Sequence, residues 1–174
     1  MPETILTKLT LADLREVLQL AGYRVETMTD PVASGDYLRS ATGGLAFDVR
    51  PGNRLAAGDG SFIDAALVAV LQVQGELPLD LVNRWNASRR FARLQLSLPF
   101  LVLTLDVSVA GGVARDHLRA QIEIWDHLVQ QLIAYLRAEL PKLDGTDRAT
   151  APPAATNATS ADRSVQPSAP ATMQ

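Results

Sequence analysis

Arginine is the residue whose spacing in this sequence most suggests chemistry. Four arginines fall within ten residues of the segment 81–96, LVNRWNASRRFARLQL, which contains no acidic residue. Such a cluster could bind phosphate, but nucleic-acid sites usually add a basic domain or aromatic residues placed for stacking. The net charge of this chain is −3. We therefore do not expect nucleic-acid binding, and we interpret Arg89 and Arg90 as part of a solvated face or of a surface for an acidic partner.

Two asparagines flank a tryptophan in the same segment. The side chains of Asn83 and Asn86 could hold a ligand, but asparagine amides also bond to the backbone at helix ends and turns. We favour this second interpretation, in which the two amides bond to the backbone where a short helix meets the next strand. Trp85 then fills the core beneath them.

Metal binding and acid–base catalysis find little support in the sequence. His117 and His127 lie ten residues apart on one predicted helix, which separates them by about 15 Å along its axis, too far to share a metal within one chain. The carboxylates that could act in pairs are scattered over separate elements: Asp64, Glu76, Asp80 and Asp106. Nucleotide-binding loops, GxSxG and HExxH are absent from the sequence. We predict no catalytic, cofactor-binding or metal-binding residue.

Composition indicates one folded domain followed by a tail. The chain has 174 residues, of which 47% are hydrophobic, enough for one domain with its own core. Residues 142–174 contain no aromatic residue and are rich in Ala, Thr, Ser and Pro. Such a segment cannot bury enough apolar surface to offset the entropy of ordering it. We predict a folded domain at 1–141 and a disordered tail at 142–174.

The same features favour a soluble cytoplasmic protein. The chain has no cysteine, which fits a reducing compartment. Its N-terminal segment lacks the basic, apolar and small-residue regions of a secretory signal. No apolar run approaches the roughly 20 residues that span a bilayer. We expect no membrane partner.

The first half of the chain predicts a helix and then strands. Thr10 can cap a helix over 10–21, and Gly22 follows it where a left-handed backbone is needed. The run 62–73, FIDAALVAVLQV, suits a buried helix or a buried strand, and we predict a strand in its second half. Three earlier segments alternate like strands: 23–26, 37–42 and 45–50.

Gly43 and Gly44 separate two of these segments and suit a tight hairpin turn. Pairing across that turn sets Leu38 opposite Val49. It also sets Arg39 opposite Asp48, and this opposite-charge pair supports the register.

A second hairpin is predicted at 92–98 and 101–109, after a short helix that begins near Pro78. Its apolar residues alternate in both strands, so one face of the hairpin is dry and the other wet. We predict a register that sets Leu96 opposite Leu103 and Arg93 opposite Asp106.

A long amphipathic helix is predicted from about residue 114 to residue 140. Its main apolar seam comprises Leu118, Ile122, Trp125, Val129, Leu132, Leu136 and Leu140. A second apolar ridge runs beside it: Ile124, Leu128 and Tyr135. The seam can cover the sheet, but the ridge needs another cover, either the first helix or a second copy of the protein. We favour a homodimer, because cyclic dimers are the commonest oligomers.

Three stretches resemble the YbjN-like family: the opening LADLREVLQLAGYRVE, the cluster Asn83, Trp85, Asn86 and Phe91, and Gly111-Gly112 before the last helix. The resemblance covers about residues 10–140. It implies a fold like that of type III secretion chaperones, and a family described as bacterial sensory transduction regulators. It assigns structural roles to these residues and brings no catalytic residue with it. One departure is that Val113-Ala114 precede the last helix where a Ser or Thr cap is expected.

Together these observations predict an α+β fold, an antiparallel sheet covered by an N-terminal helix and a long C-terminal helix. The predicted function is a non-enzymatic protein-binding domain, a chaperone-like or regulatory adaptor in stress or signalling regulation. Its predicted partner surfaces are the second ridge with Arg89 and Arg90, and the wet face of the last hairpin. The alternative is a small-ligand sensor or an enzyme with a pocket between sheet and helices. A closed polar pocket would favour the alternative, and an exposed apolar surface the adaptor.

Overall fold

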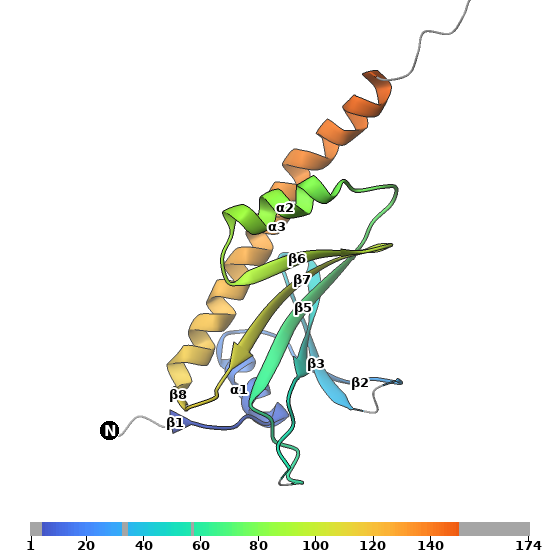
Figure 1. Ribbon diagram of the computed structural model, residues 1–174. Helices are drawn as coiled ribbons and strands as arrows, with labels where there is room; N and C mark the ends of the chain where they lie inside the picture. The colour runs from blue at the N-terminus through green and yellow to red at the C-terminus, as the bar shows by residue number, and fades with distance from the viewer. Residues whose placement is uncertain (1–4, 33–34, 57, 150–174) are drawn as a thin grey trace, which may run out of the picture.

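The protein is described by a computed structural model that covers residues 5–32, 35–56 and 58–149 (Figure 1). In this part of the chain a six-stranded antiparallel sheet is combined with three helices, which confirms the predicted α+β class. The elements are β1 (Ile5–Leu6), α1 (Leu11–Leu20), β2 (Glu26–Thr29), β3 (Asp36–Thr42), β4 (Leu45–Pro51), β5 (Asp64–Gln72), α2 (Leu79–Ser88), β6 (Ala92–Ser97), β7 (Phe100–Ser108), β8 (Val113–Ala114) and α3 (Arg115–Ala149). The strand order of the large sheet is β2-β3-β4-β5-β7-β6.

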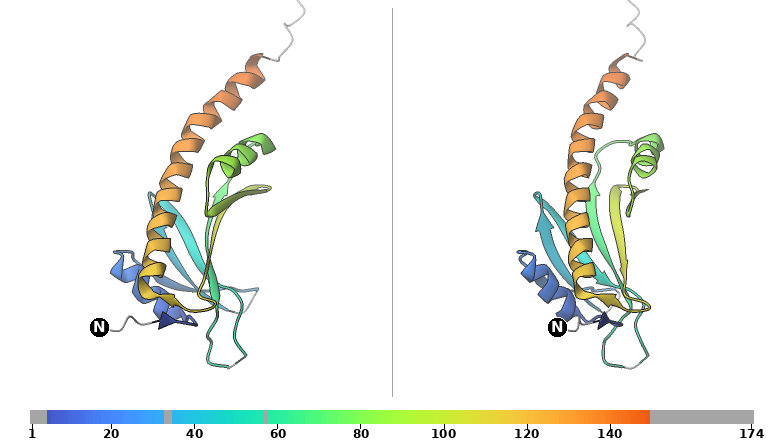
Figure 2. Two further views of the ribbon diagram at one scale, coloured as in Figure 1. Left: turned by 60° about the vertical axis from the view of Figure 1, so that its left-hand side comes forward. Right: turned by 90° about the vertical axis from the view of Figure 1, so that its left-hand side faces the viewer.

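The helices α1 and α3 cover one face of the sheet (Figure 2). Trp125 of α3 is fully buried, and its ring lies edge-on to Phe47 of β4 with ring centroids 5.6 Å apart. Leu103 of β7 is fully buried as well. The prediction that the long C-terminal helix covers an apolar face of the sheet is therefore confirmed. Because side chains alternate along a strand, the odd-numbered residues of β4 face α3 and its even-numbered residues face away.

The first helix begins and ends as predicted. Thr10 caps α1 in a capping box with Asp13, in which each side chain bonds to the other residue's backbone N–H. Gly22 has φ 90° and follows the helix. The strand expected at 23–26 is wrong in its position, because the N–H of Tyr23 still bonds to the carbonyl of Leu18 and ends the helix. The strand β2 begins only at Glu26.

The hairpin of β3 and β4 has the predicted register, with Leu38 opposite Val49 and Arg39 opposite Asp48. Gly43 and Gly44 both have positive φ, 58° and 81°. Two successive residues of this kind form the primed turn that fits the twist of a two-residue hairpin. The ambiguous run after this hairpin is the strand β5, which pairs with both β4 and β7. Only one face of this central strand is buried, at Ala65, Leu67 and Ala69, whereas Val70 on the other face is 49% exposed.

The predicted register of the last hairpin is wrong by two residues. Ser97 pairs with Phe100, which leaves Leu98 and Pro99 as the turn, joined by a cis peptide bond. Leu96 therefore lies opposite Leu101 rather than Leu103. Because the side-chain period of a strand is two, this shift leaves every side chain on its predicted face.

The ion pair expected between Arg93 and Asp106 is present in the corrected register as well. Arg93 now lies directly opposite Thr104. Its Nη1 still reaches Asp106 diagonally, at 2.9 Å. The wet face of the hairpin thus carries an exposed ion pair, which at such sites contributes little to stability.

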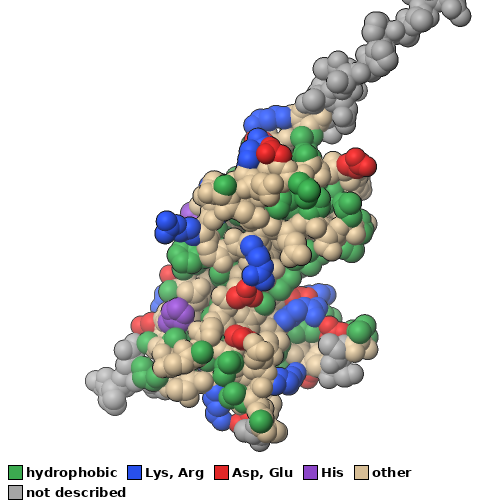
Figure 3. Space-filling model, viewed as in Figure 1, with side chains coloured by type: hydrophobic (Ala, Val, Ile, Leu, Met, Phe, Trp, Pro, Cys, Tyr) green, Lys and Arg blue, Asp and Glu red, His purple; other side chains and the backbone are tan. Residues whose placement is uncertain are grey.

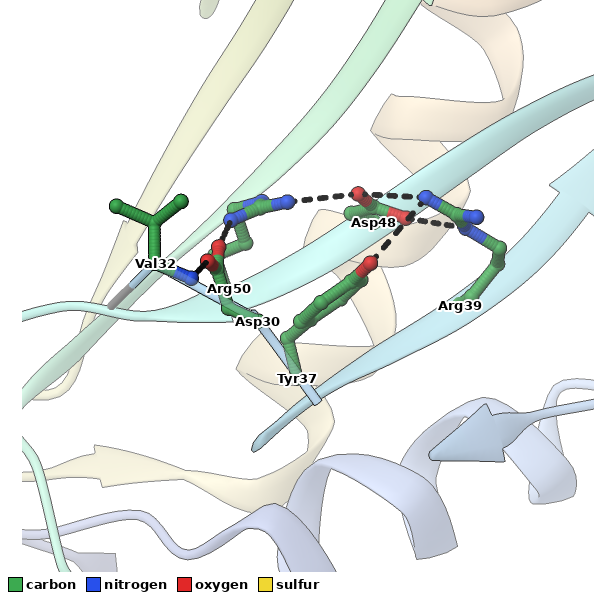
Figure 4. Close-up of polar contacts among 6 residues, drawn as sticks. All are labelled: Asp30, Val32, Tyr37, Arg39, Asp48 and Arg50. Atoms are coloured by element: carbon green, nitrogen blue, oxygen red, sulfur yellow. Dashed lines mark hydrogen bonds and ion pairs between the residues drawn. The ribbon is translucent and has the colours of Figure 1, made fainter. Parts of the chain in front are cut away.

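An ion-pair network occupies the face of the sheet away from α3 (Figure 4). The carboxylate of Asp48 accepts from Arg39 Nε at 2.7 Å and from Arg50 Nη2 at 3.2 Å. Arg50 also bonds to Asp30 at 2.7 Å, and its guanidinium carbon lies 4.3 Å from the centroid of the Tyr37 ring. The hydrogen bond to Asp48 raises the pKa of Arg39 above its ordinary value. These charges join β3, β4 and the turn after β2.

The glycine pair before the last helix has the structural role that was expected. Gly111 and Gly112 have φ of 83° and 89°. A Cβ on Gly112 would come within 2.9 Å of Cγ2 of Ile5. The turn that follows β7 therefore needs glycine both for its backbone conformation and for the close approach of β1, which pairs with β8.

The long helix α3 extends to Ala149 and so beyond the boundary predicted at residue 141. Pro141 lies inside it, at the position where the composition changes. Leu143, two residues on, is partly buried against the core, so packing continues past the proline. Leu140, predicted to be the last residue of the seam, is 39% exposed. The remainder of the predicted tail, 150–174, lies outside the described residues.

Candidate functional site

The helix α2 lies between the edge strand β6 and α3, where it covers part of the second ridge. Trp85 is fully buried, and its ring lies 5.5 Å from that of Tyr135. The Tyr135 hydroxyl donates to the carbonyl of Leu81 at 2.8 Å. Leu128 is only 5% exposed. Tyr135 is therefore partly covered by α2, which was neither of the two expected covers, and Leu128 is buried within the chain without a second copy.

An ion pair reinforces the junction between α2 and α3. Arg84 Nη2 lies 2.9 Å from Glu139 Oε2. The hydrogen bond from Lys142, together with the nearby charge of Arg84, lowers the pKa of Glu139. Arg84 also pairs with Asp80 one turn earlier in α2, at 3.0 Å. This arginine is thus a structural member of the four-arginine cluster.

The amide of Asn86 occupies the outer edge of the sheet. Its Nδ2 donates to the carbonyl of Leu94 at 2.9 Å, and its Oδ1 accepts from the N–H of Leu94 at 2.8 Å. The side chain thereby takes the two bonds that another strand would make with β6. Asn86 thus bonds to the backbone where α2 is followed by β6. Asn83 is exposed, and no hydrogen bond from its side chain is found among the described residues.

We expect Asn86→Ala to lower the free energy of unfolding by about 2 kcal/mol, because it leaves two backbone groups of Leu94 without their partner. Chemical denaturation followed by circular dichroism measures this difference. Asn83→Ala is the matched control and should change stability by less than about 0.5 kcal/mol. Equal effects of the two substitutions would show that the bonds to Leu94 contribute nothing.

The segment 88–91, which leads from α2 into β6, stands across from α3 and leaves a groove of about 500 Å³. We call this the α3 groove. One wall is formed by the segment itself: Ser88, Arg89, Arg90 and Phe91. The other wall is formed by two rows of α3, an apolar row of Ala120, Ile124 and Leu128 and a polar row of Glu123, His127 and Gln131. Residues four apart lie in line on a helix, so each row runs along the groove.

Phe91 has a strained backbone and an exposed ring. Its φ is 73°, the only positive value among the described residues other than glycine. The N–H of Ala92 bonds to the carbonyl of Arg90 at 2.9 Å, which makes Phe91 the centre of a three-residue γ-turn of the strained kind. The side chain is 68% exposed. The ring of Phe91 therefore lines the groove.

We expect Phe91→Gly to raise the free energy of unfolding by about 1 kcal/mol, because glycine adopts positive φ without the clash of a Cβ. Thermal and urea unfolding would measure the gain. Phe100→Gly is the control: Phe100 is also exposed, but it lies in the strand β7, where glycine costs about 1 kcal/mol. If Phe91→Gly destabilised the protein as Phe100→Gly does, the ring of Phe91 would be a packing residue.

Arg89 and Arg90 differ from the other arginines of the cluster. Arg84 and Arg93 have carboxylate partners, whereas neither Arg89 nor Arg90 forms an ion pair within the described part of the chain. The guanidinium of Arg89 lies 5.3 Å from the ring centroid of Trp85, and its Nη1 donates to the carbonyl of Ser88 at 3.1 Å. The groove therefore presents two positive charges that no acid of its own neutralises.

Two buried polar atoms at the groove have no hydrogen-bond partner among the described residues: Nε of Arg89 and Oε1 of Gln131. The amide nitrogen of Gln131 is engaged, 2.6 Å from Nε2 of His127. Unpartnered buried polar groups are rare in folded proteins and call for an explanation. Here a donor and an acceptor without partners belong to residues on opposite walls of the groove, and both atoms are enclosed.

The space between the sheet and the helices is nearly filled. A cavity of only about 20 Å³ remains there, with apolar walls except for Gln121. That volume is near the minimum for one water molecule. No group of three or more potential metal ligands occurs in the part of the chain that the structure describes.

Comparison with known families supports the resemblance noted in the sequence. A family model named YbjN, described as "Putative bacterial sensory transduction regulator", matches residues 10–138. The chain belongs to the YbjN family. The match runs from the cap of α1 to near the end of the packed part of α3, so it includes both walls of the α3 groove. Comparison with curated proteins and with solved structures gives no match.

The α3 groove brings together four of the five predicted partner residues of this YbjN-family protein: Arg89, Arg90, Ile124 and Leu128. The fifth, Tyr135, belongs to the contact with α2. The polar row with Glu123 was not predicted, although its spacing of four along α3 is visible in the sequence. None of the described helices of this family member is long and apolar enough to cross a membrane.

Proposed function

We propose that this YbjN-family protein is a non-enzymatic regulatory adaptor that acts by binding another protein in the cytoplasm. The observation that carries the proposal is the α3 groove. It combines an apolar row on a rigid helix, an exposed aromatic ring on strained backbone and two arginines without acidic partners. Aromatic and arginine side chains are the residues most enriched at energetically important positions of protein interfaces. Strain of the kind found at Phe91 also concentrates at functional sites.

The alternative function, a ligand sensor or an enzyme with an interior pocket, has less support. Small-molecule sites usually enclose about 300–1,000 Å³ with a few convergent polar groups. The cavity between sheet and helices, of about 20 Å³, is far smaller and almost wholly apolar. The α3 groove has the volume but is open to solvent along one side, which suits a polypeptide better than a small molecule.

The fold weakens one reason for expecting a homodimer. That expectation depended on a second apolar ridge without a cover, whereas α2 contacts Tyr135 and Leu128 is buried within the chain. Ile124 is the residue of the ridge that stays partly exposed. A second copy of the chain is accordingly one of the partners that the experiment must distinguish.

Site-specific photo-crosslinking in living cells tests the proposal. A photoreactive residue in place of His127, in the groove, should capture a discrete partner protein. The same residue in place of Arg24, an exposed arginine outside the groove, is the control. Adding Ile124→Glu should abolish the product at 127. Equal products from both positions would contradict a docking role for the groove, and a product between two copies of the chain would make the groove a self-association site.

A further inference from the structure

We infer, building on the proposed adaptor function, that the partner of the α3 groove is an acidic segment of another protein whose apolar side chain is flanked by Asp or Glu. The apolar side chain packs on Ala120 and Ile124, the part of the apolar row that is not buried. Carboxylates of the same segment meet Arg89 and Arg90 on the facing wall. This assignment concerns the chemistry of the partner, which the family description does not give.

Charge selects an acidic partner over other polypeptides. The protein as a whole carries a net charge of −3, so an acidic segment gains nothing from the overall field. The attraction has to be local. Arg89 and Arg90 supply it because neither has an ion-pair partner among the described residues. Glu123, across the groove, is already engaged with Arg119 at 3.1 Å, so it adds little repulsion.

The geometry of Arg89 favours a carboxylate in particular. The guanidinium of Arg89 stacks on the Trp85 ring, and its Nη1 donates to the carbonyl of Ser88. Its Nε has no acceptor in the described structure. An arginine that offers Nε together with an outer nitrogen binds both oxygens of a carboxylate at once, and this geometry gives direction as well as energy. A modest turn of the side chain would bring the enclosed Nε to the groove.

The apolar row sets the size of the anchor. Ile124 and Leu128 are four residues apart on α3, about 6 Å along the axis, and Ala120 precedes them by another turn. The small side chain of Ala120 leaves more room at its end of the row than Leu128 does at the other. One branched or aromatic side chain fills this space, with the ring of Phe91 above it.

Two other occupants fit less well. Nucleic acid would meet only two unpaired arginines, and on the face seen in Figure 3 positive and negative side chains of the described residues are interspersed. A second copy of the chain would have to offer an exposed apolar residue between acids. Among the exposed large apolar side chains of the described residues, Leu79 adjoins Asp80 and Leu140 adjoins Glu139, but both carboxylates are already paired with Arg84.

Selection from a displayed library of random 12-residue peptides on the full-length protein tests the inference. We expect enrichment of Leu, Ile or Phe with Asp or Glu within two residues. The selected peptide, made synthetically and labelled, should bind about tenfold more weakly to Arg89→Gln and to Arg90→Glu, the loss typical of one charge-assisted contact. Raising the salt concentration should weaken binding to the native protein and have little effect on binding to Arg90→Glu.

Control variants separate the partner chemistry from the docking function. Arg24→Glu reverses an exposed arginine outside the groove and should leave binding unchanged. Unfolding curves of each variant exclude a loss of fold. A peptide binds in the groove if Ile124→Glu abolishes its binding. If such peptides carried no acidic residue, the inference of an acidic partner would be overturned and the adaptor function would stand. Failure to select any peptide sensitive to Ile124→Glu would overturn both.

Discussion

Trp125→Ala should lower the free energy of unfolding by about 4 kcal/mol, the largest effect that we expect from one substitution in the core. The indole lies at the centre of the contact between α3 and the sheet. It is fully buried and packs edge-on against Phe47, which in turn packs against Tyr23 with ring centroids 5.9 Å apart. Alanine would leave a cavity beneath a helix that cannot move inward, since its seam from Leu118 to Leu136 is otherwise buried as well. Urea unfolding at fixed temperature would measure the change.

Trp125→Phe is the control that separates ring packing from polarity. The indole N–H of Trp125 has no acceptor in the described structure, so phenylalanine removes no hydrogen bond and relieves one unsatisfied donor. We expect a loss of about 1 kcal/mol, because the smaller ring still reaches Phe47. If the alanine variant cost no more than the phenylalanine variant, the contact of α3 with the sheet would not be the main source of stability.

A polar junction next to Trp125 shows why this contact is also specific. Asp126 accepts hydrogen bonds from Tyr23, at 3.2 Å, and from Thr42 of β3. Burial, followed by the charge of Asp126, raises the pKa of Tyr23. Three segments far apart in sequence thus meet at one carboxylate beside the largest aromatic cluster. Apolar burial supplies most of the stability there, and these bonds fix the position of α3 along the sheet.

Local chemistry made the first half of the fold predictable from the sequence. The capping residues of α1 have one favoured geometry. The glycine pair between two alternating segments has one as well, and the register of β3 with β4 followed from that turn. The last hairpin had no such turn residues. Its alternation predicted the faces correctly, but alternation alone cannot distinguish registers that differ by two residues.

The cover of the second ridge could not be predicted, because it depends on contacts between distant segments. The sequence shows that Tyr135 and Trp85 are both large and amphipathic, but not that α2 folds back onto α3. It likewise predicted Arg89 and Arg90 as partner residues, without showing that the ring of Phe91 is exposed on the same wall of the groove. Positive φ at a phenylalanine has no sequence signal, since the residues that usually adopt it are glycine and asparagine.

Trp85→Ala is the second substitution with a large expected effect, about 3 kcal/mol in the free energy of unfolding. The effect is smaller than at Trp125 because α2 lies at the edge of the sheet, where the structure can collapse partly into the space. Trp85 also supports the ring of Tyr135 and the guanidinium of Arg89, 5.3 Å from its centroid. The loss of the Trp85 ring should therefore make the wall of the α3 groove at 88–91 more mobile, and it should also lower the stability of the fold.

Hydrogen exchange read residue by residue distinguishes these two consequences. In Trp85→Ala we expect the amides of 79–91 to lose protection before those of β5 and β7. Tyr135→Phe removes only the hydrogen bond to Leu81, so it should lower the free energy of unfolding by about 1 kcal/mol. The groove of this variant should keep its affinity for an acidic peptide. Uniform loss of protection across the sheet in Trp85→Ala would mean that α2 is part of the cooperative core. The groove would then be a fixed feature of the fold, whose arginines are held as rigidly as the strands beneath them.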